Sequence, residues 1–335
     1  MKRAWICSLV LAVLAIGSYA HPAQAETGLA GTIAFERYRT PANSETYGMY
    51  SYLVSMGVDG SNEKIITPAD TAEERVPSYS PDGSRLAYTA GPSWDLYVMD
   101  RDGGTPRNIT SGGRYGDWWP SWSPDGRRLA FYRTDYNTGE TRLHSIRVDG
   151  SGLTPLTDGS WADATAAWSP DGKWIAFSRY DPSGDLYAGY QIWAVRPDGS
   201  GLRRLTAGRL QTWRPAWSPD GKWLAFGGWF KEDYEGDFYS SKGAIYVMPA
   251  TGGKPRPVTS GEYYDLEPCW SPDSKMIGFT RTITDLWLYP SLPAPASYYA
   301  NYSAPADIYA VNLDGSGLTQ LTDTPVSEEG CTWTD

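Results

Sequence analysis

One acidic position recurs along this chain, three residues before the proline, or its substitute, that opens a repeated P-x-W-S segment. The position is filled by Glu74, Asp117, Asp163, Thr212 and Asp265, with Glu328 as an approximate sixth copy. Carboxylates gathered at one opening could hold Ca²⁺, or an ammonium or guanidinium group of a partner. Two of them, such as Asp117 and Asp163, could instead act as acid and base in cleaving a glycosidic bond. The plainer alternative is a loop cap, in which each carboxylate accepts backbone N–H groups.

Aromatic side chains are the second candidate for recognition. The chain has 16 Trp and 24 Tyr against 7 Phe, and the segments around and between the repeats hold Trp118, Trp213, Trp229, Tyr234 and Tyr264. These residues do not follow the repeat period, so a common core does not require all of them. Exposed Trp and Tyr suit a protein partner or a sugar ring. Long loops can also bury their own aromatics in satellite clusters, and both interpretations stay open.

Residues for nucleophilic or metal catalysis are scarce. Of the two histidines, His21 lies in an N-terminal leader and His144 begins a repeated strand segment. That leaves no histidine suited to a nucleophile–His–Asp triad. The sequence also has no Gly-x-Ser-x-Gly nucleophile elbow. We therefore predict no catalytic residue, no metal ligand set and no cofactor, apart from Ca²⁺ as one of the candidates for the acidic opening.

The elements that position these residues are repeats. A first segment occurs five times, as in PSWSPDGRRLAF from Pro120 and PAWSPDGKWLAF from Pro215, and its turn prolines are 43, 46, 49 and 53 residues apart. A second segment lies between the copies, as in IWAVRPDGSGLRRLT from Ile192 and IYAVNLDGSGLTQLT from Ile308. Each unit thus predicts four short strands joined by Pro-Asp-Gly and Asp-Gly turns. This length and pattern are typical of one blade of a β-propeller.

The count of strands predicts how the ring closes. The K-x-I-A-F strand occurs six times, whereas the P-x-W-S strand has five good copies, and residues 330–333 stand in for the sixth at the far end of the chain. The C-terminal strand would therefore complete the first blade. We predict an all-β, six-bladed β-propeller with 3+1 closure, which removes the open sheet edges of a repeat array.

The tandem W-S-P-D-G-K-x-I-A-F and D-G-S-G-L-x-x-L-T segments resemble the WD40-like propeller repeats of the TolB-like family. The resemblance covers roughly residues 30–335. It implies the propeller fold, and it implies function much less specifically. TolB also carries an α/β domain before its propeller, and we expect this chain to lack one.

Two cysteines lie near the expected closure. Cys269 belongs to the inner strand of the last blade and Cys331 to the closing strand, which are predicted neighbours. An exported protein can keep a disulfide, so we hypothesise a Cys269–Cys331 bond that locks the ring. The distance between adjacent inner strands decides whether the two Cα atoms lie within the limit of about 7 Å.

The N-terminus is typical of a secretory signal peptide, here residues 1–25. Lys2 and Arg3 precede a short apolar run, and Ala23-Gln24-Ala25 forms a cleavage motif. Residues 26–335 would then be one propeller domain, periplasmic or secreted after cleavage near Ala25. A formal net charge of −10 argues against nucleic acid as the partner, and the apolar run is too short for membrane insertion.

Together these features favour a monomeric, non-enzymatic binding module. We expect its loop-rich face and channel mouth to capture a protein or peptide segment. The alternative is a propeller that binds or cleaves a polysaccharide, with loop aromatics as stacking platforms and paired carboxylates as the reacting groups.

Overall fold

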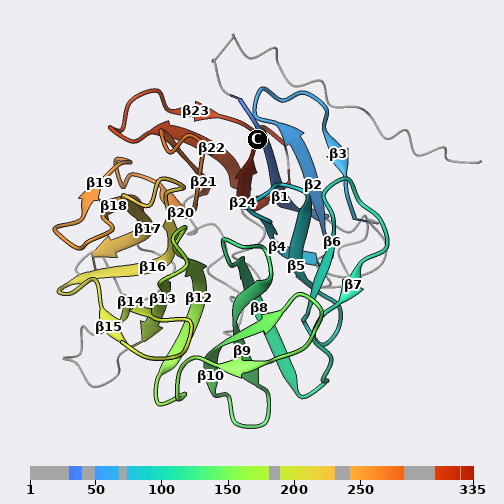
Figure 1. Cartoon of the computed structure of the whole chain (residues 1–335). Coiled ribbons are helices and arrows are strands. Elements are labelled where there is room, and N and C mark those ends of the chain that lie inside the picture. The colour runs from blue at the N-terminus through green and yellow to red at the C-terminus, as the bar shows by residue number, and fades with distance from the viewer. Residues whose placement is uncertain are drawn as a thin grey trace, which may run out of the picture.

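The computed structural model describes residues 30–39, 50–67, 74–180, 189–230, 242–282, 306–324 and 326–335. Within these ranges the chain forms 24 strands and no helix. The strands make six four-stranded sheets arranged around a central channel (Figure 1). The proposed signal peptide lies outside the described residues. The predicted all-β propeller is confirmed.

The strands of each blade follow one another outward from the channel, with the innermost strand first. Blade 1 consists of β24 (Glu328–Thr334), β1 (Thr32–Arg39), β2 (Tyr50–Gly57) and β3 (Lys64–Ile65). Blade 2 consists of β4 (Glu74–Tyr79), β5 (Arg85–Ala90), β6 (Asp95–Asp100) and β7 (Arg107–Asn108). Blade 3 consists of β8 (Tyr115–Trp122), β9 (Arg128–Asp135), β10 (Thr141–Arg147) and β11 (Thr154–Pro155).

The other three blades follow the same order. Blade 4 consists of β12 (Ala162–Trp168), β13 (Ile175–Tyr180), β14 (Tyr190–Val195) and β15 (Arg203–Arg204). Blade 5 consists of β16 (Leu210–Trp217), β17 (Trp223–Phe230), β18 (Ala244–Pro249) and β19 (Arg256–Pro257). Blade 6 consists of β20 (Tyr264–Trp270), β21 (Met276–Thr282), β22 (Ala306–Asn312) and β23 (Thr319–Gln320).

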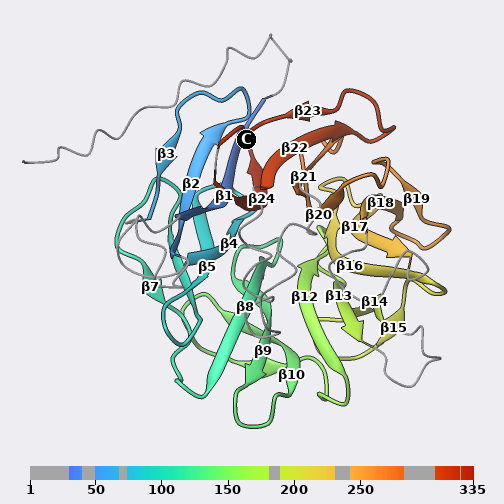
Figure 2. The same ribbon diagram turned by 180° about the vertical axis from the view of Figure 1, so that it is seen from behind.

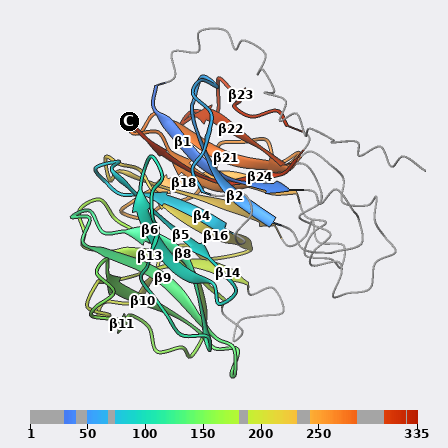
Figure 3. The ribbon, with the colours of Figure 1, turned by 90° about the vertical axis from the view of Figure 1, so that its right-hand side faces the viewer.

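The ring closes in blade 1, as the strand count predicts. Strand β24 from the C-terminus pairs with β1, and Ile33 lies opposite Trp333. The two strands run side by side at the seam, seen from behind in Figure 2 and from the side in Figure 3. The 3+1 closure therefore joins the two ends of the described chain in a single sheet.

The core lies between neighbouring sheets. One apolar cluster joins Leu96 of β6 to Leu129 and Phe131 of β9, and the other blade junctions have equivalent clusters. The second strand of every blade supplies one aliphatic side chain with no exposed surface: Ile33, Leu86, Leu129, Ile175, Leu224 and Ile277. Packing between blades is thus what the apolar repeat positions encode.

The polar repeat residues cap turns and strands. In five blades an aspartate of the Ser-Pro-Asp turn accepts the backbone N–H two residues on; these are Asp82, Asp125, Asp171, Asp220 and Asp273. In all six blades the threonine of the Leu-Thr pair, or its equivalent, accepts a backbone N–H near the start of the third strand; these are Thr67, Thr110, Thr157, Thr206, Thr259 and Thr322. These repeated aspartates and threonines therefore serve the fold.

A disulfide joins blade 6 to the closing strand. Cys269 of β20 and Cys331 of β24 have Cα atoms 5.9 Å apart, within the usual range. Gly278 of β21 lies opposite Cys269, where the second strands of blades 2 to 5 have alanine: Ala87, Ala130, Ala176 and Ala225. A Cβ at Gly278 would lie 2.7 Å from the sulfur of Cys269, so this glycine makes room for the bond.

The connections between strands lie at two ends of the ring. The turns between the first two strands and between the last two share one end, which we call the turn face. The other connections, including those between blades, share the opposite end, which we call the loop-rich face. Tyr234, one of the predicted aromatic residues, lies outside the described residues.

Candidate binding site

Each inner strand contains a bulge. The pairing register shifts at this point in every blade. The residue before the strand proline, or its substitute, has a left-handed φ of 49–69°; these residues are Val76, Trp119, Thr165, Arg214, Glu267 and Gly330. Such angles are unusual for any residue but glycine. Because all six blades share the bulge, it belongs to the fold, and it re-aims whichever side chain it carries.

Hydroxyl groups of the neighbouring blade hold two of these bulges. The N–H of Arg214 donates to Ser178 Oγ at 3.0 Å, and the N–H of Gly330 donates to Thr280 Oγ1 at 3.1 Å. Ser178 and Thr280 occupy the second strands of blades 4 and 6, so these two blades fix the bulges of blades 5 and 1. The unusual backbone is therefore supported by tertiary contacts that local sequence does not reveal.

Arg214 makes the contact that crosses the channel. Its guanidinium carbon lies 4.4 Å from the ring centroid of Trp119, and it forms an ion pair with Glu267. These three residues, which we call the channel cluster, come from β16, β8 and β20. Blades 3 and 5 are separated by blade 4, so Arg214 reaches past the inner strand of that blade. The side chains of Arg214 and Glu267 keep 18% and 13% of their surface exposed.

The acidic position of the repeat forms neither the expected ring of carboxylates at an opening nor the expected loop cap. Asp117, Asp163 and Asp265 are at most 1% exposed. Each carboxylate is bound through both oxygens by an arginine of the neighbouring strand, at 2.6–2.8 Å; the partners are Arg133, Arg179 and Arg281. The structure thus places these aspartates in buried ion pairs. They neither open into the channel nor cap a loop.

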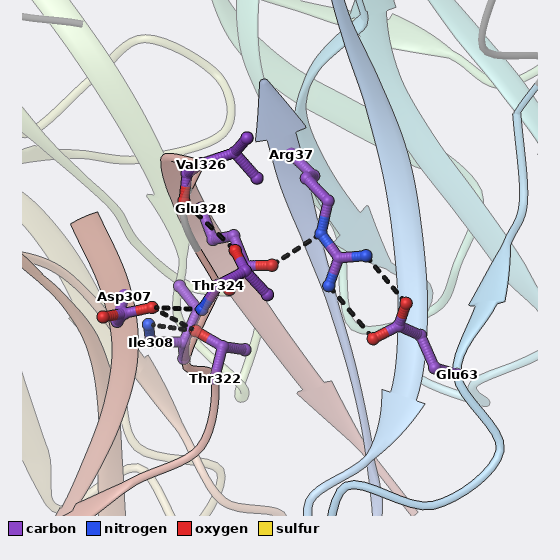
Figure 4. Close-up of polar contacts among 8 residues, drawn as sticks. All are labelled: Arg37, Glu63, Asp307, Ile308, Thr322, Thr324, Val326 and Glu328. Atoms are coloured by element: carbon purple, nitrogen blue, oxygen red, sulfur yellow. Dashed lines mark hydrogen bonds and ion pairs between the residues drawn. The ribbon is translucent and has the colours of Figure 1, made fainter. Parts of the chain in front are cut away.

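Blade 1 has the same arrangement with a longer acid. Glu328 has no exposed surface and accepts Arg37 Nε at 2.5 Å, while Arg37 also donates two bonds to Glu63 (Figure 4). Asp307 of blade 6 lies beside them and accepts Thr322 Oγ1 and the N–H of Thr324. Burial, together with the charge of Glu328, raises the pKa of Asp307 to about 6. Burial likewise raises the pKa of Glu328, although Arg37 opposes the shift.

Two blades depart from this pattern. In blade 5 Thr212 lies opposite Gly228, so acid and arginine are both replaced. In blade 2 Glu74 lies opposite Ala90, and the side chain of Glu74 is outside the described part of the structure. A signal for the pairs exists in the sequence, since an arginine follows a phenylalanine by two residues in the four paired blades. The four arginines are Arg37, Arg133, Arg179 and Arg281.

The predicted aromatic residues divide into two groups. Trp118 stacks on Trp94 across the junction of blades 2 and 3, with ring centroids 4.5 Å apart. Trp213 meets Tyr190 edge-on across the junction of blades 4 and 5 at 4.1 Å. All four of these residues are half-buried. Trp229 is only 6% exposed and serves packing.

Tyr264 is the remaining predicted aromatic residue, and it begins β20 half-buried. Sequence reasoning selected neither Arg214 nor Glu267, because their importance depends on the bulge. Trp118 and Trp213 directly precede the bulge residues Trp119 and Arg214 in the chain. These two predicted aromatic residues therefore adjoin the channel cluster along the chain.

Groups suited to catalysis or metal binding are scarce in the same part of the chain. The described residues contain no group of three or more His, Cys, Asp or Glu that could hold a metal ion. Burial lowers the pKa of His144 to about 4, so this imidazole is neutral at physiological pH. No helix among the residues described is long and apolar enough to cross a membrane.

Known proteins with this architecture are diverse. TolB from Acinetobacter baumannii superposes with a TM-score of 0.65 at 20% identity, over 90% of this chain and 66% of that one. A chain of a nidogen/laminin complex gives 0.64 at 11% identity, over 90% and 98%. Oligogalacturonate lyase from Vibrio parahaemolyticus gives 0.53 at 15% identity, over 81% and 71%. At these identities the likeness concerns the fold alone.

Sequence comparison is more specific than the superpositions. No curated protein sequence matches this chain. The model of the TolB beta propeller domain, however, matches residues 28–234, which is more than half of the sequence. That match includes four of the five copies of the first repeated segment. The chain belongs to the TolB β-propeller family.

Proposed function

We propose that this propeller is an exported binding module that captures a protein or peptide segment at the channel mouth of its loop-rich face. The family resemblance supports a periplasmic or secreted location. The superposition with a chain of the nidogen/laminin complex supports protein binding as a use of this architecture. Specific support comes from the channel cluster.

The contact of Arg214 with Trp119 and Glu267 is the observation that carries the proposal. Trp and Arg dominate the binding energy of many protein interfaces, and here both sit partly exposed at the centre of the ring. A carboxylate of a partner could replace Glu267 at the guanidinium, and a basic side chain could replace Arg214 on the indole. The cluster therefore offers groups that a peptide can compete for.

Polysaccharide cleavage is the less favoured alternative. The superposition with oligogalacturonate lyase keeps it in view. A general acid or base needs a carboxylate free to exchange a proton, whereas both oxygens of Asp117, Asp163 and Asp265 hold arginine. Trp94 is also a poor sugar platform, because Trp118 stacks on its ring at 4.5 Å and Arg75 lies 5.2 Å from it.

Peptide selection tests the proposal while the partner is unidentified. Peptides are selected from a random display library on the folded protein, and the affinities of the winners are measured by biolayer interferometry. The variants Trp118→Ala and Arg214→Gln alter the proposed site. Trp174→Ala is the matched control, since Trp174 lies at the turn face between Arg196 and Arg203.

We expect Trp118→Ala and Arg214→Gln to weaken binding by about 30-fold, the loss typical of a central interface residue. Trp174→Ala should leave the affinity unchanged. Circular dichroism spectra of all variants should match the parent. Loss of binding in Trp174→Ala alone, or selection of glycans but no peptides on a parallel array, would overturn the proposal.

A further inference from the structure

The seam of the ring contains an unusual pair of like charges. Glu36 of β1 lies directly opposite Glu329 of β24, and the next pair along the strands is Arg37 opposite Glu328. Like charges directly opposite in a sheet are destabilising, whereas opposite charges attract. The two pairs lie on opposite faces of blade 1, because side chains alternate along a strand. The closing strand is thus attracted on one face and repelled on the other.

Arg75, the Tyr38 hydroxyl and the backbone N–H of Val76 partly compensate the charge of Glu36, without cancelling the effect of burial. Arg75 of β4 approaches Glu36 Oε1 at 3.9 Å, and it also donates to Tyr38 Oη at 3.1 Å. Ser327 donates to Glu329 at 3.0 Å, and the charges of Arg75 and Arg214 act on Glu329 as well.

Glu36 is only 3% exposed, and its Oε1 accepts no hydrogen bond from any described residue. A buried carboxylate in this state is costly.

Protonation would relieve that cost. Burial raises the pKa of Glu36 to about 7, with Arg75 opposing the shift and Glu329 adding to it. Burial also raises the pKa of Glu329, against the influence of Ser327, Arg214 and Arg75. A carboxyl whose pKa is higher in the closed ring than in the open one favours closure at low pH. Closure therefore weakens as the pH rises from about 4.5 through 7.

A covalent bond limits how far the seam can open. Cys331 follows Glu329 by two residues, and its disulfide to Cys269 ties β24 to blade 6. The part of β24 before Cys331 has no such bond. Charge repulsion at Glu329 therefore acts on the segment that the disulfide leaves free to separate from β1.

We propose that the facing glutamates Glu36 and Glu329 make the β1–β24 seam a pH-responsive latch. The latch is closed while at least one of the two carboxyls is protonated, and it loosens when both are ionised. The disulfide keeps β24 attached in the loosened state. The device would let the ring respond to the pH of its compartment at the place where its two ends meet.

Hydrogen–deuterium exchange tests the latch on the intact, oxidised protein. Protection factors, corrected for intrinsic exchange, are measured for peptides covering β1 and β24 between about pH 5.5 and 8. If opening returns Glu36 to its ordinary pKa of 4.5, protection should fall by about 30-fold over this range. Peptides from β12 and β13, which hold the Asp163–Arg179 ion pair, provide an internal control and should not change.

Three variants separate the latch from a general effect of pH. Glu36→Gln and Glu329→Gln each remove one carboxyl while keeping its shape. Glu36→Gln should abolish most of the pH dependence, whereas Glu329→Gln should reduce it, because Glu329 adds less than burial to the raised pKa of Glu36. Glu140→Gln is the control, because Glu140 pairs with Arg142 at the surface of blade 3 and should leave the dependence intact. Two glutamine variants are used so that poor folding of one does not prevent the test.

The proposal is overturned if protection at the seam does not vary with pH in the parent protein. It is equally overturned if the fall persists unchanged in both Glu36→Gln and Glu329→Gln. Reducing the disulfide should enlarge the response, and a response confined to the reduced protein would contradict the latch in its native, oxidised form.

Discussion

We predict that Gly278→Ala destabilises the protein that has the Cys269–Cys331 disulfide and stabilises the protein that lacks it. In the oxidised protein, Gly278→Ala places a Cβ 2.7 Å from the sulfur of Cys269 and 3.3 Å from that of Cys331. The first distance requires the disulfide to shift, and overpacking of this kind costs about 1–3 kcal/mol. Trp333 lies at an ordinary contact distance of 3.6 Å, so the clash concerns the sulfurs alone.

The same substitution should stabilise a protein without the disulfide. With Cys269→Ala and Cys331→Ala, the sheet position regains the Ala–Ala pair that Ala167 and Ala176 form in blade 4. Alanine in a strand is then favoured over glycine by about 0.5–1 kcal/mol. Loss of the disulfide itself costs about 4 kcal/mol in the chain-entropy model, since the bond spans 62 residues.

A double-mutant cycle in urea measures both effects. Free energies of unfolding are compared for the parent, Gly278→Ala, the cysteine-free double variant and the combination of all three changes. We expect a loss of stability from Gly278→Ala in the oxidised protein and a gain in the cysteine-free one. A loss of equal size in both backgrounds would refute the claim that this glycine exists to accommodate the bond.

Three further predictions concern stability. Asp163→Ala should lower the free energy of unfolding by about 3–5 kcal/mol because it leaves Arg179 buried without its partner. Asp163→Ala combined with Arg179→Leu should restore much of that stability, as measured by thermal denaturation. Glu36→Gln should raise the free energy of unfolding by about 3 kcal/mol at about pH 8 and by less than about 1 kcal/mol at about pH 5. The reason is that the raised pKa of Glu36 makes its ionised form costly in the folded protein. Equal shifts of the urea midpoint at both pH values would contradict this. Thr259→Val should lower the free energy of unfolding by about 1–3 kcal/mol, because it leaves the N–H of Ile245 without its hydrogen bond. An unchanged urea midpoint would argue against this role of Thr259.

The fold was predictable because the repeat encodes it several times over. Each blade restates the same turn residues and the same apolar positions, and the deficit of one inner strand at the N-terminal end predicts closure by residues 330–333. The Cys269–Cys331 pairing follows from that closure, since it makes β20 and β24 neighbours with Cα atoms 5.9 Å apart. Such inferences rest on counting and adjacency, which sequence supplies directly.

The site was less predictable because it depends on contacts between strands and blades. Asp163 finds its partner Arg179 sixteen residues later, on the next strand, so the acid alone suggested an open mouth. The channel cluster depends on left-handed backbone at Trp119, Arg214 and Glu267, which no local propensity favours. The neighbouring blade fixes that backbone, as with Ser178 at Arg214, and sequence patterns do not report such support.

Photo-crosslinking tests the central claim, that a peptide binds at the channel mouth of the loop-rich face, most directly. Benzoylphenylalanine is placed at Trp118 in one protein and at Trp174 in another, and each is irradiated with a selected peptide at a saturating concentration, because Trp118 itself contributes to binding. We predict a covalent adduct with the residue at position 118 and none at position 174. Crosslinking at position 174 alone would place the partner on the turn face and contradict the proposed binding site.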